Sequence, residues 1–103
     1  MIEKVYKMTS GDEKTVERII EDENIHYAHI ILGKDEGTPE HYTNSNLYMT
    51  VIRGKLSIRL AEQKTNEYEA GTILRIPFNT NMSLNNLYND ILELTVVKVP
   101  APK

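Results

Sequence analysis

Apolar residues along this chain are grouped in short runs, and residues that favour turns separate one run from the next. The runs cover residues 25–32, 46–53, 55–62, 72–77 and 90–100. Gly, Pro, Asn, Asp and Ser are frequent between them, as in GKDEGTP at 33–39 and TNSN at 43–46. Several short strands at this spacing predict an all-β fold, either a sandwich or a barrel.

The order of apolar and polar residues within a run predicts which face of the strand is buried. In 55–62 the two kinds of residue alternate, and successive side chains on a strand point to opposite faces. The inward set is then Leu56, Ile58 and Leu60, and the outward set is Ser57, Arg59 and Ala61. By contrast, LYMTVI at 47–52 is apolar on both faces, which indicates a strand buried on both sides. Pro77 and Pro100 should end their strands, because proline cannot donate a ladder hydrogen bond.

The segment SGDEKTVERII at 10–20 is compatible with two structures. Ser10 and Glu13 have the spacing of a helical capping box. Three apolar residues then follow at helical spacing: Val16, Ile19 and Ile20. The same stretch is rich in β-branched side chains, which favour a strand. We expect a strand over 14–21, because the rest of the chain has a β pattern.

Size and charge limit the kind of protein that this sequence can encode. The length of 103 residues predicts one domain, 1–103. A net charge of −3 and the lack of a lysine–arginine cluster argue against nucleic acid and anionic membranes as partners. Without cysteine the chain can form neither a disulfide nor a thiolate metal site. We find no signal peptide and no apolar run of about 18–20 residues, so we expect a cytoplasmic protein.

Glycine, proline and histidine in the middle of the chain follow the pattern of a known family. GTPEHYTNSNLYMTVIRG at 37–54 contains His41 between two terminal glycines. Further on, five residues separate Gly71 from Pro77. With these motifs, about residues 25–100 resemble the small single-domain cupins of the conserved-barrel type (cupin 2, RmlC-like). The resemblance implies a double-stranded β-helix, the jelly-roll barrel.

The resemblance also implies where a cupin metal would be bound, and only one of the four positions holds its usual ligand. His41 is retained, whereas the other three positions hold Thr43, Leu47 and Met82. A threonine hydroxyl is a weak neutral donor, leucine cannot ligate, and a thioether suits copper(I) better than iron, manganese or zinc. We therefore expect no cofactor, and a barrel that binds a small molecule without the usual cupin metal.

The inner face of the barrel provides the candidate ligand site. The predicted ligand-binding residues on this face are His41, Thr43, Leu47, Met49 and Met82. The predicted set also includes His29 and Tyr48, although Tyr48 alternates with the inner face. This lining is mostly apolar and has an imidazole and a hydroxyl near the mouth, which suits a small, partly apolar molecule. His41 could also act as a general base with Tyr48 as a proton donor, so both a binding protein and an enzyme are compatible with these residues.

A metal-dependent enzyme, an oxygenase or an isomerase, is the alternative. If His29 faces the interior, it could approach His41 across the barrel. Glu93 could then complete a two-histidine, one-carboxylate set for a divalent transition metal. The simpler interpretation makes His29 a hydrogen-bonded core residue and Glu93 a solvated strand residue.

Two partners are expected: a small-molecule ligand and a second copy of the chain. Small cupins often form homodimers, and the resemblance extends this expectation to the present chain. The strands over 14–21 and 90–100 would pair or pack across a two-fold axis.

Overall fold

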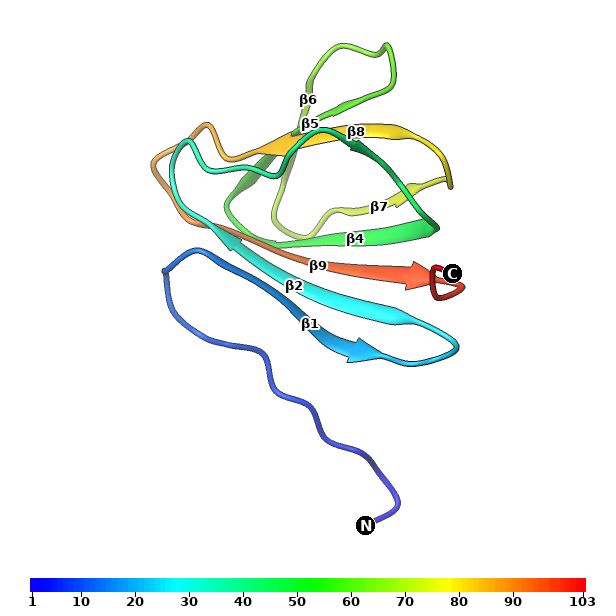
Figure 1. The fold of residues 1–103 in the computed structure, drawn as a ribbon. Helices are drawn as coiled ribbons and strands as arrows, with labels where there is room; N and C mark the ends of the chain where they lie inside the picture. The colour runs from blue at the N-terminus through cyan, green and yellow to red at the C-terminus, as the bar shows by residue number, and fades with distance from the viewer.

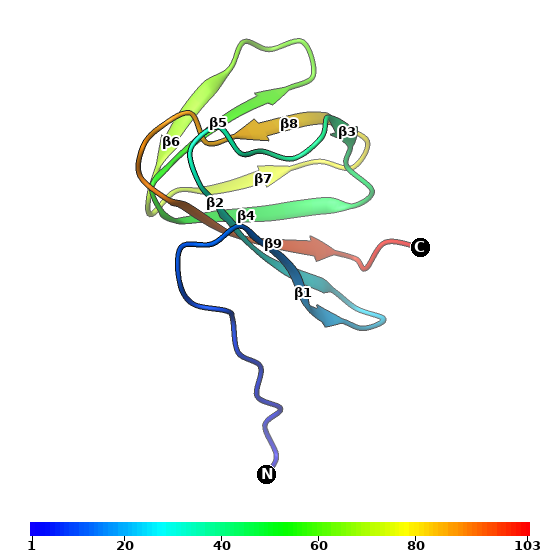
Figure 2. The ribbon, with the colours of Figure 1, turned by 60° about the vertical axis from the view of Figure 1, so that its left-hand side comes forward.

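Two antiparallel β-sheets face each other in the computed structural model of the chain, which describes residues 1–103 (Figure 1). The first sheet has the order β1-β2-β9-β4-β7, with strands Thr15–Glu21 (β1), His26–Leu32 (β2), Leu92–Val99 (β9), Asn46–Arg53 (β4) and Ile73–Ile76 (β7). The second sheet has the order β3-β8-β5-β6, with strands His41–Tyr42 (β3), Asn81–Asn85 (β8), Lys55–Leu60 (β5) and Asn66–Glu69 (β6). The chain passes repeatedly from one sheet to the other, as in a jelly roll (Figure 2).

The hydrophobic core lies between the two sheets. It consists of 13 buried apolar residues: Ile30, Leu32, Leu47, Met49, Val51, Leu56, Ile58, Ile76, Met82, Leu84, Leu92, Leu94 and Val96. Most strands contribute every second residue to this set, because alternate side chains on a strand point to the same face. Full burial of one such side chain stabilises the fold by about 1.5–3 kcal/mol.

Most of the predicted strands are confirmed. The five apolar runs correspond to β2, β4, β5, β7 and β9. The ambiguous segment forms the strand β1 and not a helix. The strands β7 and β9 end at Ile76 and Val99, directly before Pro77 and Pro100. The sequence analysis missed β3, β6 and β8, which are short and contain many polar residues.

One prediction about burial is wrong. The strand β4 is buried on one face only, because Tyr48 and Ile52 remain 42% and 41% exposed. Its apolar outer face is a surface of the single chain. Ser57 points away from Leu56 and Ile58 as predicted, yet it is buried and its hydroxyl lies 3.4 Å from the carboxylate of Glu67.

The N-terminal residues lie outside the two sheets. Residues 1–14 form no strand or helix, and the first of them lead away from the body of the molecule (Figure 1). The strand β1 that follows is at the edge of the first sheet, where Val16 remains 61% exposed. No helix of the chain has the length and apolar character that crossing a membrane would need.

Candidate functional site

A cavity of about 190 Å³ lies between the two sheets, next to the edge strands β1 and β3. It is lined by 14 residues, 8 of them hydrophobic: Val16, Arg18, Ala28, Ile30, Thr38, His41, Thr43, Asn44, Leu47, Met49, Met82, Leu84, Val96 and Lys98. Five predicted site residues are among them: His41, Thr43, Leu47, Met49 and Met82. For scale, a cavity of roughly 150 Å³ can hold a benzene molecule.

Paired strands supply the apolar wall of this cavity. Met49 of β4 lies opposite Val96 of β9, and both side chains point inward. Residues opposite each other on antiparallel strands share a face, so these two form one continuous apolar surface. Met82 and Leu84 of β8 contribute the facing wall from the second sheet.

His41 lies at the rim of the cavity, and one of its two ring nitrogens is free to bind a ligand. The short strand β3 places His41 opposite Met82 of β8, so both side chains point the same way. The Nδ1 atom of His41 lies 2.8 Å from the carbonyl oxygen of Pro39. Because a carbonyl only accepts, Nδ1 must carry the hydrogen and donate it. The Nε2 atom remains available to a ligand, as an acceptor in the neutral ring or a donor in the imidazolium.

Two threonine hydroxyls at the cavity differ in their hydrogen bonding. The hydroxyl of Thr43 donates to the carbonyl of Pro77 at 2.7 Å and accepts from the backbone N–H of Thr80 at 2.9 Å. It therefore fixes the turn before β8. The hydroxyl of Thr38 is buried and has no hydrogen-bond partner. A buried polar atom without a partner costs free energy, so Thr38 can gain from a ligand atom.

His29 does not line the cavity. In β2, Ile30 and Leu32 point into the barrel, and the alternation of side chains turns His29 to the opposite face. Glu93 is on that same outer face, because Leu92 and Leu94 take the inner one. The three-residue set of His29, His41 and Glu93 is therefore not assembled in the structure. The alternative that required His29 to face the interior is therefore wrong.

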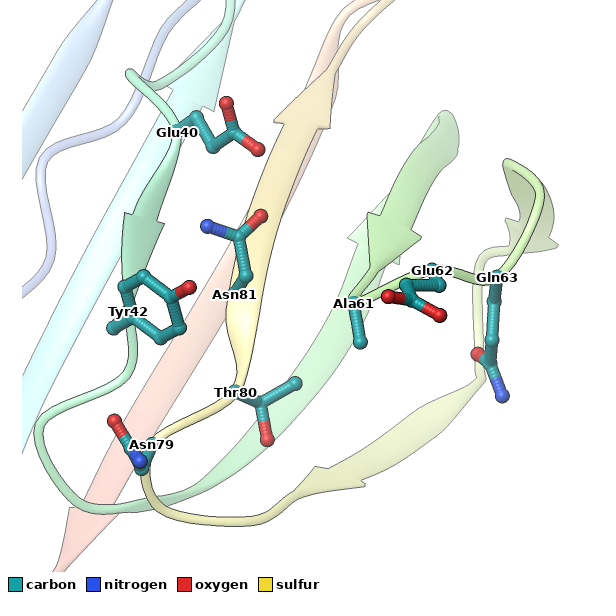
Figure 3. A pocket seen from close by; sticks show the side chains of 8 residues that line it. All are labelled: Glu40, Tyr42, Ala61, Glu62, Gln63, Asn79, Thr80 and Asn81. Atoms are coloured by element: carbon teal, nitrogen blue, oxygen red, sulfur yellow. The ribbon is translucent and has the colours of Figure 1, made fainter.

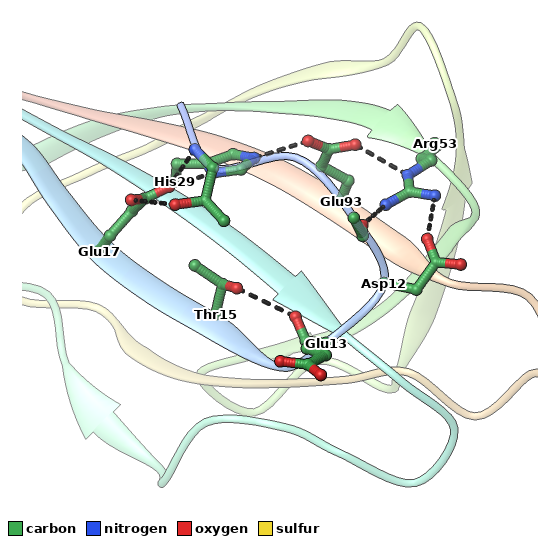
Figure 4. Close-up of polar contacts among 9 residues, drawn as sticks. Asp12, Glu13, Thr15, Glu17, His29, Arg53 and Glu93 are labelled. Carbon is green, nitrogen blue, oxygen red and sulfur yellow. Dashed lines mark hydrogen bonds and ion pairs between the residues drawn. The ribbon is translucent and has the colours of Figure 1, made fainter. Parts of the chain in front are cut away.

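His29 instead takes part in a hydrogen-bonded network across the outer face of the first sheet (Figure 4). Its Nδ1 lies 2.7 Å from a carboxylate oxygen of Glu17, and its Nε2 lies 2.6 Å from one of Glu93. The side chain of Arg53 donates to Glu93 at 2.8 Å and to Asp12 at 2.9 Å. Both ring nitrogens can donate to ionised carboxylates only if the ring is an imidazolium. The expectation of a hydrogen-bonded His29 is thus confirmed, whereas Glu93 is not a simple solvated residue.

The network changes the acidity of both carboxyl groups. The hydrogen bond from His29, followed by the one from the Thr9 backbone, holds the pKa of Glu17 below its ordinary value. Burial raises the pKa of Glu93, but the hydrogen bonds from His29 and Arg53 outweigh burial and the net pKa is lowered. Both groups are therefore ionised at neutral pH. The network connects β1, β2, β9 and β4 with the N-terminal segment.

Comparison with known proteins decides the family. No protein-family model matches the chain. It is, however, 39% identical to an uncharacterised protein of Methanocaldococcus jannaschii, over all of this chain and 90% of that protein. The crystal structure of that protein, described as an RmlC-like cupin family protein with a double-stranded β-helix fold, superimposes with a TM-score of 0.95 over 99% of this chain and 94% of the other. The chain is a cupin.

More distant cupins share the fold alone. A cupin superfamily protein of Desulfitobacterium hafniense has a TM-score of 0.76 at 6% identity, over 91% of this chain and 84% of that one. A cupin 2 conserved-barrel protein of Salinispora arenicola has a TM-score of 0.74 at 10% identity, over 92% of this chain and 82% of that one. At these identities the likeness says nothing about ligands.

The family motif implies a metal, but the residues of this cupin do not fit one. Leu47 has no donor atom, and both hydrogen-bonding roles of the Thr43 hydroxyl are already taken within the chain. Met82 offers only a thioether. No group of three or more His, Asp or Glu side chains is arranged so that it could hold a metal ion. His41 alone is a usual ligand among the four motif positions.

Tyr48 is also absent from the cavity of this cupin. It alternates with Leu47 and Met49 and points outward from β4, where it is 42% exposed. Its Cα partner on β9 is Val97. Tyr48 therefore cannot donate a proton to a ligand held beside His41.

A second hollow lies on the outer side of the β3–β8 pair (Figure 3). Its lining is mostly polar, with 2 hydrophobic residues among 8: Glu40, Tyr42, Ala61, Glu62, Gln63, Asn79, Thr80 and Asn81. Glu40 is already paired with Arg59 at 2.7 Å. This hollow is a surface groove and offers little apolar contact area, so the barrel cavity is the better candidate site.

Nine of the 14 cavity residues were not predicted from the sequence, among them Arg18, Thr38 and Lys98. The period of two could have found Lys98, which follows Leu92, Leu94 and Val96 on the inner face of β9. It could not have found Thr38, which lies in a loop whose path depends on both sheets.

Proposed function

We propose that this cupin binds a small, partly apolar molecule in the barrel cavity, without the metal that the family motif would hold. The observation that carries the proposal is the cavity itself, with about 190 Å³ of space and 8 hydrophobic residues among its 14. Concave, mostly apolar sites with a few polar groups are the usual ligand sites of proteins.

The chemistry of the lining supports binding more than catalysis. The apolar wall from β4, β8 and β9 would hold an apolar body, while Thr38 and His41 offer hydrogen bonds. Methionine side chains are flexible, so Met49 and Met82 can adapt to the shape of a ligand. Tyr48, the proton donor considered together with His41, points outward from β4, so these two residues form no acid–base pair in the cavity.

The affinity expected for a minimal probe is modest. At about 0.35–0.7 kcal/mol for each of its non-hydrogen atoms, in the lower part of the range for small ligands, benzyl alcohol should bind with a dissociation constant of about 0.1–10 mM. Titration of benzyl alcohol, followed by the methyl NMR signals of Met49 and Met82, measures this directly. Both signals should shift and saturate.

A variant that obstructs the cavity tests the location. Ala28→Trp places a large ring on a cavity residue that is only partly buried, and we expect it to weaken probe binding about tenfold or more. The matched control is Ala70→Trp in an exposed turn, which should bind as the wild type does. If the NMR spectrum of Ala28→Trp shows that this variant does not fold, Val96→Phe replaces it as the variant that obstructs the cavity. Absence of shifts in the wild-type protein, or stoichiometric metal in the purified protein, would contradict the proposal.

We also propose that the chain forms a homodimer through the outer face of the first sheet. Four apolar side chains are exposed on that face: Tyr48, Ile52, Ile73 and Val99. Five more are exposed in the N-terminal segment: Met1, Ile2, Val5, Tyr6 and Met8. A second copy supplies the same apolar groups, so the face can cover itself across a two-fold axis. Since β9 has neighbours on both edges, it would contribute through its face and not by strand pairing.

A further inference from the structure

We infer that the ligand of the barrel cavity is an anion: a small carboxylate with an apolar tail, whose head group is held by Lys98 and Arg18. The inference rests on the proposed function and names the ligand class. It starts from the charges of the cavity lining, which differ from those of the whole protein.

The cavity is basic although the protein is acidic. The chain has 15 acidic residues against 12 lysines and arginines, yet no Asp or Glu is among the 14 residues that line the cavity. The lining does include Arg18, Lys98 and His41. An anion would therefore meet only neutral and basic groups inside.

Lys98 lacks a counter-ion within the chain. It takes part in none of the salt bridges of the molecule. Lys98 is paired across the sheet with His26 of β2, and His26 is paired in turn with Glu21 of β1. Glu21 therefore carries the nearest carboxylate in this row of paired residues, with His26 between it and Lys98. Glu21 is engaged with Arg18 instead, at 3.7 Å and with both side chains largely exposed. Such an exposed pair is weak and leaves Arg18 able to bind a ligand.

The environment of Lys98 opposes its charge in the ligand-free protein. Burial, and then the nearby guanidinium of Arg18, hold the pKa of Lys98 below its ordinary value. An anion placed between the two cations would favour the charged form of both. Binding of a carboxylate thus removes an unfavourable interaction that is already present.

Two further groups of the cavity suit carboxylate oxygens. The buried hydroxyl of Thr38 has no partner and can donate one hydrogen bond. The Nε2 atom of His41 can donate when the ring is protonated, because Nδ1 is committed to Pro39. The apolar wall of Leu47, Met49 and Val96 accommodates a hydrocarbon tail. The cavity therefore offers basic groups and apolar contact area to the same ligand.

The experiment compares hexanoate with hexanamide, which has the same shape and no charge. Dissociation constants come from NMR titration of the wild-type protein at low and at high salt. We expect hexanoate to bind about tenfold more tightly than hexanamide at low salt, and salt to reduce this difference. Lys98→Gln should lower hexanoate affinity about tenfold and leave hexanamide affinity unchanged. Lys64→Gln, in an exposed turn, is the control with the same change in net charge.

Each outcome separates this inference from the proposed function. Equal binding of hexanoate and hexanamide, or equal effects of Lys98→Gln and Lys64→Gln, overturns the inference but leaves a neutral-ligand cavity. Binding of neither compound overturns both. If Lys98→Gln does not fold, Arg18→Gln gives the same comparison from the other cation.

Discussion

Gly54 shows how one residue fixes the connection between the two sheets. It links β4 of the first sheet to β5 of the second, with a backbone φ of +82°. A Cβ atom at this position would lie 2.2 Å from the carbonyl oxygen of Ile91. Only glycine avoids both the strained conformation and the collision. The same residue ends the cupin-like motif in the sequence, so its importance was visible there, although its contact with Ile91 was not.

Gly54→Ala should destabilise the protein strongly, and Gly71→Ala provides the control. Gly71 also has a positive φ, +94°, but a Cβ there would meet nothing within 4 Å. The left-handed conformation alone should cost about 1–2 kcal/mol in Gly71→Ala. Gly54→Ala should cost at least about 2 kcal/mol more, because backbone atoms must move. Urea unfolding measures both, and equal losses would show that the contact with Ile91 is relaxed without cost.

At the scale of an element, β2 separates two different environments. Its inner face contributes Ile30 and Leu32 to the core, and its outer face carries His29 between Glu17 and Glu93. A one-residue change of phase would exchange the two faces. This is why the position of His29 could not be read from β2 alone. Because His29 is buried and bonded to two carboxylates, we assign it a structural role that joins three strands.

The network on β2 predicts a stability that depends on pH. The pKa values of Glu17 and Glu93 are lowered in the folded protein from an ordinary value of 4.5. Their contribution is therefore complete above about pH 4.5 and is lost as the pH falls through the lowered folded values. Glu93→Gln should lose about 2–3 kcal/mol of unfolding free energy at pH 7, since a hydrogen bond between charged groups is removed.

The difference between Glu93→Gln and the wild-type protein should be smaller at pH 3 than at pH 7, because the wild-type carboxyl takes up a proton as the pH falls through its lowered pKa. Urea unfolding at both pH values measures this. Glu62→Gln, in an exposed turn, should match the wild type at both. A difference that is the same at pH 3 and pH 7 would mean that Glu93 contributes through packing and not through its charge.

At the scale of the whole molecule, several large apolar residues are exposed on the outer face of the first sheet and in the N-terminal segment. Ile73 is 66% exposed on the outer face of the first sheet, and the N-terminal segment leads away from the body (Figure 2). Exposed apolar groups gathered on one face mark interaction surfaces. The strand β4, predicted to be buried on both faces, would be so only when a second copy covers it.

The dimer is tested by the mass of the protein in solution at tens of micromolar. Light scattering should give twice the 11.8 kDa of one chain. Ile73→Glu should shift the mass toward one chain, because it places a charge in the proposed interface. Leu87→Glu replaces another exposed apolar residue, 54% exposed and away from that face, and should remain dimeric. A wild-type protein of single-chain mass would contradict the proposal.

The sequence by itself determined the long strands and indicated the family through its glycine, proline and histidine motifs. Apolar runs bounded by turn residues located the long strands, because these strands bury alternate side chains and therefore carry a strong period of two. Five of the predicted site residues line the cavity, and two of these, Leu47 and Met49, share a face because they are two positions apart on β4. The short strands β3, β6 and β8 have too few apolar residues to show such a period.

Only the tertiary structure decided what lies together across the sheets. It placed His29 and Glu93 on the outer face of the first sheet, whereas His41 belongs to the second sheet and lines the cavity between the two. It also brought Lys98 of β9 close to Arg18 of β1. These relations depend on strand order and register between residues distant in sequence. A local sequence pattern shows which side chains of one strand share a face. It does not show which strands pair, or in which register, and this pairing decides which side chains of different strands lie together.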